Sequence, residues 1–399
     1  MRLKVPSSKS LTQRAIFIAS LIPEESIILD HLECDDSFYL KEALKKLGVK
    51  FKKENNKLKV IGRKRFKEPN SPLYVGNGGT TARFLTALSL TMDFEYTLDG
   101  SPEIYRRPYP GLFNLLSSLG IRFHFHRERY CLPVTIYPNR DLNLPDKLEI
   151  DSNRSSQQLS SLLMVLPIFK KEIEVEVKGK LPSKPYIDLT LYVMERFGVK
   201  VKRRKYEKFY IPNESYRASE IHIEGDWSSS AFLISASYLL NKKIEIENLN
   251  PNSLQGDRVF PELLKRLPKS GERVEIDMEM TPDLVPPLVA TALFSNGITV
   301  LKNIEHLRIK ESDRIRVLSR ELNKAGFKIE EEKDKLIIYG GGYYTPKKEI
   351  YLDPEKDHRM ALCFAIVSLK ANWIKIKDRG CVTKSFPNFW ELFERIKKG

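Results

Sequence analysis

The 399-residue chain has little cysteine and histidine, and it has no long apolar segment. Its four cysteines form no C-x-x-C pair and its six histidines are scattered, so the spacing of a zinc or iron–sulfur site is missing. We therefore expect no metal and no cofactor. No window of about 20 apolar residues occurs, which excludes a membrane-spanning helix. The N-terminus, MRLKVPSSKS, lacks the apolar region of a secretory signal, and this predicts a cytoplasmic protein.

Positive charge is in excess. The chain carries 67 Lys and Arg residues against 52 Asp and Glu, a formal net charge of +15. Either nucleic acid or small anionic substrates would explain this excess. The sequence has no zinc finger, no basic heptad region and no interleaving of aromatic and basic residues, and basic clusters such as 202–208 fall in expected hairpins. We therefore expect small-molecule partners, no nucleic acid, no membrane and a monomeric chain.

One pattern recurs along the chain: an apolar-periodic helix, a glycine, and two short strands separated by a polar turn. Copies occupy residues 44–62, 115–136, 193–212 and 321–340, with a degraded copy at 263–277. The glycines that end the helices are Gly48, Gly120, Gly198 and Gly326. Each fits the C′ position of a helix, where a left-handed backbone penalises any residue with a Cβ.

The recurrence predicts about six α/β units in two clusters of three, because units of about 65 residues are too small to fold alone. A single large α/β domain with coincidental hairpins is the alternative. The chain ends in a helix, 390–399, with no strands after it. The N-terminal strand, near residues 2–5, is expected to complete that last unit.

Polar and basic residues gather where apolar helices are expected to begin. Residues 6–14 read PSSKSLTQR, 76–83 read GNGGTTAR and 152–158 read SNRSSQQ. Helix N-termini with cations, hydroxyls or unobstructed backbone N–H groups suit an anion. Ordinary capping explains each motif equally well when it is taken alone. The glycine-rich loop matches neither a Walker nor a Rossmann pattern.

Similar motifs follow later in the chain: SKPYID at 183–188, TPD at 281–283, RIKESDRIR at 308–316, DPEKDHRM at 353–360 and TKSFPNF at 383–389. Lys310, Glu311 and Arg314 are expected on one helical face. Asp283, the His358–Arg359 pair and Lys384 are expected at helix starts. Because such groups recur in nearly every repeat, we expect the helix N-termini to converge on one anion-binding cleft between the two halves.

In their order along the chain these motifs resemble the EPSP synthases, within the enolpyruvyl transferase family. The resemblance rests on PSSKSLTQRA (6–15), GNGGTTAR (76–83), RRP (106–108), SSQ (155–157), SKPY (183–186), GDWSSSAF (225–232), TPD (281–283), RIKESDR (308–314), DHRM (357–360) and TKSFP (383–387). It implies an α/β fold of two similar domains, each an inside-out α/β barrel of three βαβαββ units. Residues 1–8 with 225–399 would form one domain and 9–224 the other.

The resemblance also implies an activity: transfer of the enolpyruvyl group of phosphoenolpyruvate to the 5-hydroxyl of shikimate 3-phosphate, with release of phosphate, in the shikimate pathway. The active site would lie in the cleft, with shikimate 3-phosphate on the side of the inserted domain. By the same resemblance, Asp283 would take the hydroxyl proton. Glu311 would protonate C3 of phosphoenolpyruvate, with Lys9 as the other candidate.

The binding residues that the resemblance implies fall into two overlapping sets. Shikimate 3-phosphate would be bound by Lys9, Ser10, Arg14, Ser155, Ser156, Gln157, Ser183, Tyr186, Asp283, His306 and Lys310. Phosphoenolpyruvate would be bound by Lys9, Asn77, Gly79, Thr80, Arg83, Arg107, Gln157, Arg314, Arg359 and Lys384.

Three positions depart from the family's pattern. His306 stands where many members have asparagine, which affects the expected contact to the 3-phosphate, and Phe84 replaces a frequent proline. Gly78 replaces alanine or serine and leaves sensitivity to the family's inhibitor, glyphosate, open.

Two alternatives come from different classes of protein. The sister enzyme that acts on UDP-N-acetylglucosamine typically carries a cysteine shortly before its Arg-Pro, and residues 100–108 contain none. A non-catalytic binder of anions or nucleic acid would be retained on heparin or RNA without turnover. The acid–base candidates among the cations argue against such a binder.

Overall fold

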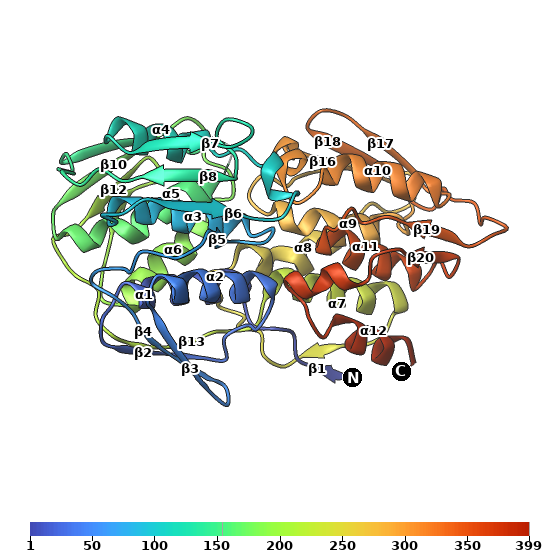
Figure 1. Cartoon of the computed structure of the whole chain (residues 1–399). Coiled ribbons are helices and arrows are strands. Elements are labelled where there is room, and N and C mark those ends of the chain that lie inside the picture. Colours follow the sequence, from blue (N-terminus) through green and yellow to red (C-terminus); the bar gives the residue numbers. More distant parts are fainter. Residues whose placement is uncertain (154, 399) are drawn as a thin grey trace. The chain divides into compact units, whose positions relative to one another are not determined.

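The computed structural model describes residues 1–153 and 155–398, and the chain passes twice between two units (Figure 1). Unit 1 comprises Met1–Pro6 and the chain from Glu224 onward, and unit 2 comprises Ser7–Ile223. These boundaries lie one or two residues from the predicted positions. None of the described helices is long and apolar enough to cross a membrane.

In unit 2 the described strands form three sheets of four strands each. The strands are β2 (Glu25–Leu29), β3 (Lys50–Glu54), β4 (Lys57–Ile61), β5 (Leu73–Tyr74), β6 (Tyr96–Asp99), β7 (Arg122–Phe125), β8 (Val134–Tyr137), β9 (Lys147–Asp151), β10 (Ile173–Lys178), β11 (Lys202–Arg204), β12 (Lys208–Ile211) and β13 (Glu220–His222). Their orders are β13-β2-β4-β3, β5-β6-β8-β7 and β9-β10-β12-β11. Each sheet begins with a parallel pair and ends in an antiparallel hairpin, as the predicted repeat requires.

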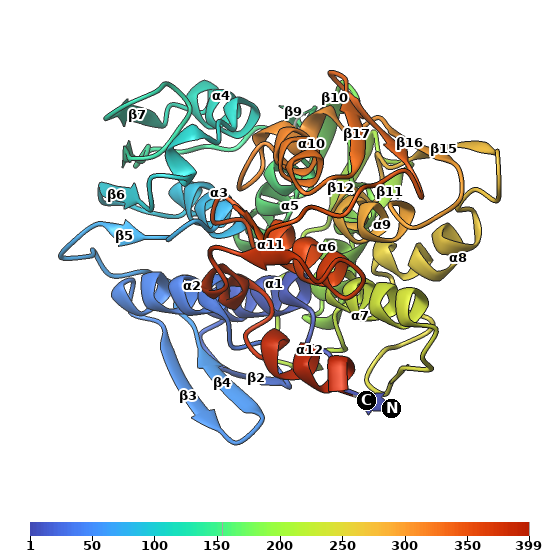
Figure 2. The ribbon, with the colours of Figure 1, turned by 90° about the vertical axis from the view of Figure 1, so that its right-hand side faces the viewer.

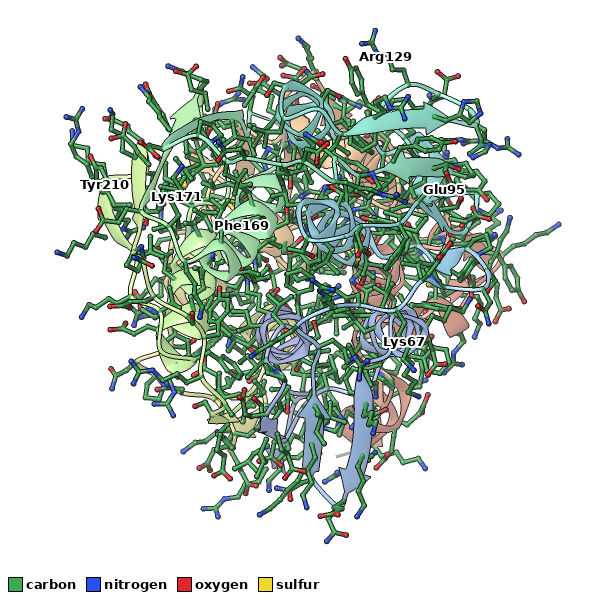
Figure 3. All side chains as sticks on the ribbon, turned by 60° about the vertical axis from the view of Figure 1, so that its left-hand side comes forward. Lys67, Glu95, Arg129, Phe169, Lys171 and Tyr210 are labelled. Atoms are coloured by element: carbon green, nitrogen blue, oxygen red, sulfur yellow. The ribbon has the colours of Figure 1, made fainter. Side chains whose placement is uncertain are left out.

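Helices fill the interior of unit 2. They are α1 (Lys9–Ser20), α2 (Asp35–Lys46), α3 (Gly79–Ala87), α4 (Pro110–Ser118), α5 (Ser156–Val165) and α6 (Pro185–Arg196). Helices α1, α3 and α5 are buried around nearly their whole circumference, polar residues such as Gln13 and Arg14 included. Strand β9 instead alternates exposed and buried residues, so one face of its sheet meets solvent. Figure 3 shows several of these helices end-on, with the strands outside them.

Unit 1 repeats this organisation in shorter form. Its strands are β1 (Arg2–Leu3), β14 (Glu245–Ile246), β15 (Arg273–Asp277), β16 (Ile298–Lys302), β17 (Lys328–Glu331), β18 (Lys335–Tyr339), β19 (Ile350–Leu352) and β20 (Ile374–Ile376), and its helices are α7 (Trp227–Leu240), α8 (Phe260–Lys265), α9 (Val285–Ala292), α10 (Arg314–Lys324), α11 (His358–Ser368) and α12 (Phe389–Lys398). Among the described residues, β15-β16-β18-β17 is a full sheet, whereas β1–β14 and β19–β20 are two-stranded parallel pairs. Helices α7, α9 and α11 pack side by side (Figure 2).

Two expectations about the weaker repeats are wrong. The N-terminal strand does not complete the C-terminal unit, because Arg2 and Leu3 pair in parallel with Glu245 and Ile246 of β14. Residues 263–277 are not a degraded copy either. Their helix, α8, is not followed by a hairpin, because β15 pairs in parallel with β16 and so opens the next sheet.

The helix-ending glycines confirm the C′ prediction. Gly48, Gly120, Gly198 and Gly326 have φ values of 91°, 84°, 90° and 96°. This left-handed backbone turns the chain from a helix towards the following hairpin. A Cβ added at Gly198 would meet only the Arg217 side chain, at 3.5 Å or more, so the cost of a side chain there is conformational rather than steric.

We predict that Gly198→Ala lowers the free energy of unfolding by about 1–2 kcal/mol, because alanine is strained in the left-handed region. Urea unfolding followed by circular dichroism measures this loss. Gly342→Ala is the matched control, since Gly342 lacks a positive φ and a Cβ there would meet a single atom at 3.8 Å. Equal stability of the two variants would contradict the conformational explanation.

Candidate active site

Arg14 anchors the candidate site of unit 2. It lies on α1 and is 2% exposed, and its guanidinium donates to the Thr190 hydroxyl (2.8 Å), the Ser10 carbonyl (3.0 Å), the Tyr186 carbonyl (3.3 Å) and the Ser160 hydroxyl (3.4 Å). These described partners are all neutral, and burial lowers the pKa of Arg14 to about 10. A buried cation held by neutral groups is costly unless an anion joins it. Arg14 is therefore well placed to bind one.

The N-terminus of α1 adds a second cation. Lys9 is the first residue of the helix, which Ser8 caps through the backbone N–H of Leu11. The Lys9 ammonium pairs with the carboxylate of Asp36 on α2, 2.8 Å away, and both side chains are largely buried. No motif in the sequence predicted a role for Asp36. Ser10 follows on the same helical turn, so Lys9, Ser10 and Arg14 are brought together as predicted.

The glycine-rich loop gathers two more arginines at the start of α3. Arg83 donates to the carbonyl of Gly79 (2.6 Å), and Arg107 donates to the backbone and side-chain oxygens of Asn77 (both 3.2 Å). A Cβ at Gly79 would lie 2.6 Å from Arg107 and 2.9 Å from Arg83. A side chain at this position would displace the two guanidinium groups from their present places. Thr80 follows on the first turn of α3, so the predicted loop residues form one local group.

The remaining predicted residues of unit 2 occupy the starts of α5 and α6, which pack against each other. Ser155 caps α5 and accepts from the backbone N–H of Gln157 (3.3 Å), with Ser156 buried between them. Ser183 precedes α6 with a left-handed φ of 55°, and the Tyr186 carbonyl contacts Arg14. Because Arg14 also reaches Ser160 of α5 and Thr190 of α6, it joins the three helices one to two turns after their N-termini.

In unit 1 the candidate site centres on Arg314, at the first residue of α10. Its guanidinium, 1% exposed, pairs with the carboxylates of Asp357 (2.7 Å), Glu311 (2.9 Å) and Asp283 (3.0 Å). Burial lowers the pKa of Arg314 and the three carboxylates raise it, with a net upward shift. Arg314 is therefore a permanent cation that holds three carboxylates in one place.

Two further cations complete this network. Arg359 pairs with the second oxygen of Asp283 (3.0 Å), and Lys384 lies 3.9 Å from Glu311. Five of the seven residues predicted in this part of the chain are thus brought together, and these ion pairs do not include His306 or Lys310. Asp357 was missed, although it caps α11 through the backbone N–H of Arg359 (2.9 Å) and binds Arg314. An aspartate before an apolar helix signals a cap, but its bond to Arg314 depends on tertiary structure.

Two local expectations in unit 1 are wrong. Lys310 and Glu311 do not share a helical face with Arg314, because α10 begins only at Arg314, where Asp313 accepts from the backbone N–H of Arg316 (3.1 Å). Lys310 instead follows the 3-10 turn Glu305–Ile309, which contains His306. Lys384 ends the 3-10 turn Gly380–Lys384 and does not open a helix.

A second carboxylate near Asp283 was also missed. Asp257 lies on the 3-10 turn Gly256–Val259, is 4% exposed and accepts a hydrogen bond from the Ser228 hydroxyl. Burial, and next the charge of Asp283, raise the pKa of Asp257 to about 7. Within the described part of the chain, no group of three or more His, Cys, Asp and Glu residues could hold a metal ion.

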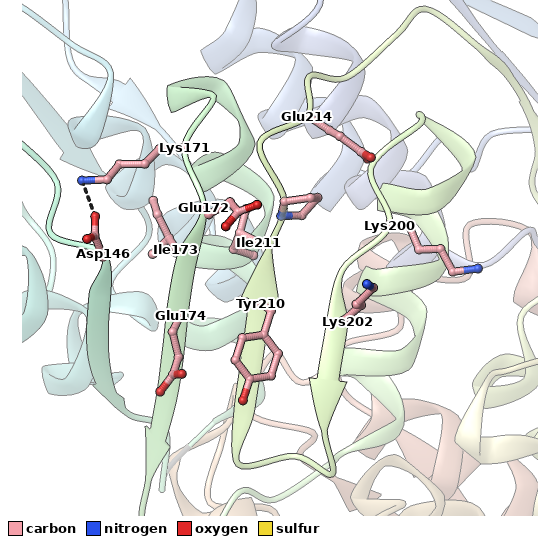
Figure 4. A pocket seen from close by; sticks show the side chains of 11 residues that line it. Asp146, Lys171, Glu172, Ile173, Glu174, Lys200, Lys202, Tyr210, Ile211 and Glu214 are labelled. Atoms are coloured by element: carbon pink, nitrogen blue, oxygen red, sulfur yellow. Dashed lines mark ion pairs between the residues drawn. The ribbon is translucent and has the colours of Figure 1, made fainter.

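A hollow of about 740 Å³ in unit 2 lies elsewhere. Its lining comes from the ends of β10, β11 and β12 and their flanking segments, where Lys171 pairs with Asp146 at 2.7 Å (Figure 4). It contains none of the residues predicted to bind substrate. Its lining carries both acidic and basic side chains.

Comparison with solved structures defines the fold. An EPSP synthase from Acinetobacter baumannii matches with a TM-score of 0.75 and 24% identity, covering 99% of this chain and 95% of that one. The enolpyruvyl transferase NikO from Streptomyces tendae matches with a TM-score of 0.70 and 12% identity, covering 99% and 94%. The fold is therefore the mixed α/β fold of the enolpyruvyl transferases.

Sequence comparison is more specific. The profile of the EPSP synthase family, 3-phosphoshikimate 1-carboxyvinyltransferase, matches residues 1–393. The enzyme of that name from Syntrophobacter fumaroxidans is 35% identical, covering 99% of this chain and 97% of the relative. The one from Paraburkholderia phytofirmans is also 35% identical, covering 99% and 96%. The chain belongs to the EPSP synthase family, which confirms the resemblance found in the sequence.

We predict that Arg314→Met lowers the free energy of unfolding by about 3–5 kcal/mol, because three carboxylates lose a buried cation. Arg320→Met is the control: Arg320 lies on the same helix and pairs with two glutamates, but it is 43% exposed and its loss should cost less than about 1 kcal/mol. Chemical unfolding of both variants measures the difference. Similar losses in both would show that Arg314 does not organise the site.

Proposed function

We propose that this chain catalyses transfer of the enolpyruvyl group of phosphoenolpyruvate to the 5-hydroxyl of shikimate 3-phosphate, releasing phosphate. The observation that carries the proposal is the network around Arg314, because it joins both acid–base candidates, Asp283 and Glu311, to cations that suit a phosphorylated substrate. Membership of the family supports the same reaction.

In this proposal unit 2 binds shikimate 3-phosphate. Arg14 and Ser10 hold its carboxylate, since the Arg14 guanidinium has only neutral described partners. The helix N-termini at Ser155 and Ser183 suit the 3-phosphate, because backbone N–H groups and hydroxyls both donate to it. Beside the phosphate stand Ser156, Gln157 and Tyr186, whereas unit 1 contributes Lys310 and His306 to its binding.

Phosphoenolpyruvate is bound by the remaining cations. Unit 1 supplies Arg314, Arg359 and Lys384. Unit 2 supplies Lys9, Arg83 and Arg107, together with Asn77, Gly79, Thr80 and Gln157. Arginine suits this role because its planar guanidinium binds carboxylate or phosphate through two parallel hydrogen bonds. Charge-assisted bonds of this kind contribute roughly 1.5–3 kcal/mol each.

The chemistry needs a base at the 5-hydroxyl and an acid at C3 of phosphoenolpyruvate. Asp283 is held by Arg314 and Arg359, 3.0 Å from each, and is proposed to accept the proton of the 5-hydroxyl. Glu311 lies between Arg314 and Lys384 and donates the proton to C3 as the hydroxyl oxygen attacks C2. The tetrahedral intermediate then loses phosphate, and the C3 proton returns to the protein. Lys9 is the other candidate for the C3 proton.

The finer architecture belongs to the same proposal. The six α/β units form two inside-out α/β barrels of three units each, and the active site lies in the cleft between the barrels. The enzyme works in the cytoplasm as a monomer and does not bind nucleic acid. The alternation of exposed and buried residues in the sheets and the buried helices within each unit support the barrel arrangement.

The direct test is release of inorganic phosphate from phosphoenolpyruvate and shikimate 3-phosphate in the presence of EDTA. We expect release that depends on both substrates and persists with the chelator, because the chemistry is assigned to side chains alone. UDP-N-acetylglucosamine in place of shikimate 3-phosphate tests the sister reaction. Binding of both substrates without phosphate release would contradict the proposal and favour a non-catalytic anion binder.

We predict that Glu311→Gln lowers kcat by about 10²–10⁴-fold while the circular dichroism spectrum is preserved, because general acid–base groups contribute effects of that size. The control is Glu305→Gln, an exposed glutamate on the neighbouring 3-10 turn that should leave kcat unchanged. Turnover of the Glu311 variant near that of the parent enzyme would remove Glu311 from this role.

A further inference from the structure

Residues 310–313 carry two of the groups that the proposed chemistry uses, although they belong to neither a helix nor a strand. The 3-10 turn Glu305–Ile309 ends before them and α10 begins after them. Within this segment Glu311 is the proposed acid and Lys310 is a proposed ligand of the 3-phosphate. A segment outside regular structure keeps one geometry only if other contacts fix it. Arg308 makes several such contacts.

The guanidinium of Arg308 joins the two ends of this segment. Its Nη1 donates to both carboxylate oxygens of Asp313, at 2.9 and 3.2 Å. Asp313 is also the cap of α10, because its Oδ1 accepts from the backbone N–H of Arg316 at 3.1 Å. The ion pair therefore connects the 3-10 turn to the first turn of α10 and encloses residues 309–312 between them.

The rest of the guanidinium is anchored to a different part of unit 1. Nε donates to the carbonyl of Lys333 (2.9 Å) and Nη2 donates to the carbonyl of Glu332 (2.6 Å), in the turn between β17 and β18. These two strands pack against α10 (Figure 1). All three nitrogens of Arg308 are thus engaged, and its side chain is 25% exposed. A planar guanidinium can bridge three acceptors in this way, whereas an ammonium cannot.

The side chain of Glu311 is held by other residues. Its carboxylate accepts from Nη2 of Arg314 at 2.9 Å and lies 3.9 Å from Lys384. These contacts orient the side chain, whereas the contacts of Arg308 fix the ends of the backbone segment that carries it. A displacement of about 1 Å in a reacting group can cost about 10²-fold in rate. Loss of the Arg308 contacts should therefore lower turnover through Glu311.

We propose that Arg308 is a positioning residue: by joining the β17–β18 turn to Asp313, it fixes residues 309–312 and so sets the place of the Glu311 carboxylate. It acts through Glu311 and is assigned no contact with substrate. The effect on catalysis rests on the proposed function. The fixing of the segment rests on the contacts of Arg308 alone.

The first test is the kinetics of Arg308→Met, which keeps a long side chain but donates no hydrogen bond. We expect kcat to fall by about 10–100-fold. The KM for phosphoenolpyruvate should change by a smaller factor, because Arg359 and Lys384 lie on other segments. Arg266→Met is the matched control, since Arg266 is exposed at the end of α8 and donates to a backbone carbonyl at 3.2 Å. An unchanged kcat in Arg308→Met, or an equal loss in the control, would overturn the proposal.

A double variant distinguishes positioning from general destabilisation. If Arg308 acts through Glu311, adding Arg308→Met to Glu311→Gln should lower kcat little further, because the group that Arg308 places is already absent. A loss of folded enzyme would instead multiply the two effects. Multiplied effects would therefore contradict the proposal.

Arg308→Lys tests the shape of the side chain and serves as the second variant if Arg308→Met does not fold. Lysine keeps the charge, but its ammonium cannot bridge two backbone carbonyls and a carboxylate at once. We expect this variant to lose most of the activity that Arg308→Met loses. A kcat equal to that of the parent enzyme would show that the guanidinium is not needed and would contradict the proposal.

Hydrogen exchange separates this inference from the proposed function. The backbone amides of residues 309–316 should exchange faster in Arg308→Met than in the parent chain, and at the parent rate in Arg266→Met. If the parent chain releases no phosphate but this difference is found, the proposed function fails and the fixing of the segment by Arg308 stands. Equal exchange in the parent chain and Arg308→Met would overturn the inference.

Discussion

A buried guanidinium must have a partner for its charge and for its N–H groups, and this constraint organises the candidate sites of both units. Arg14 satisfies its hydrogen bonds with hydroxyls and carbonyls and leaves its charge uncompensated among the described residues. Arg314 is compensated by three carboxylates. One arginine is thus prepared for an anion, and the other holds the carboxylates of the proposed acid–base groups, Asp283 and Glu311, in place.

The fold supplies the positions that these arginines need. Helices α1, α3 and α5 are almost wholly buried inside unit 2, so their N-termini, with Lys9, Gly79 and Ser155, are fixed by packing rather than by flexible loops. The same principle holds in unit 1, where α7, α9 and α11 pack together and present Ser228, Asp283 and Arg359 near their first turns. Rigid elements of this kind preorganise a polar site.

Sequence reasoning predicted the repeat, the left-handed helix-ending glycines and the residues that form each polar cluster, because these depend on local periodicity and on motifs in a fixed order. It placed Lys310 and Glu311 wrongly, since the cap at Asp313 delays the start of α10. It paired β1 with the wrong unit, since strand pairing across 243 residues has no local signal. It assigned no role to Asp36, Asp257 or Asp357, whose partners come from distant segments.

The measurement that tests the account most directly is a crystal structure of the chain with shikimate 3-phosphate and an unreactive analogue of phosphoenolpyruvate. The account predicts that the shikimate carboxylate contacts Arg14 and the 3-phosphate contacts the N-terminus of α5 at Ser155. The analogue should accept hydrogen bonds from Arg314 or Arg359, with Glu311 facing its C3 position. Ligands bound away from these arginines, for example in the hollow of Figure 4, would contradict it.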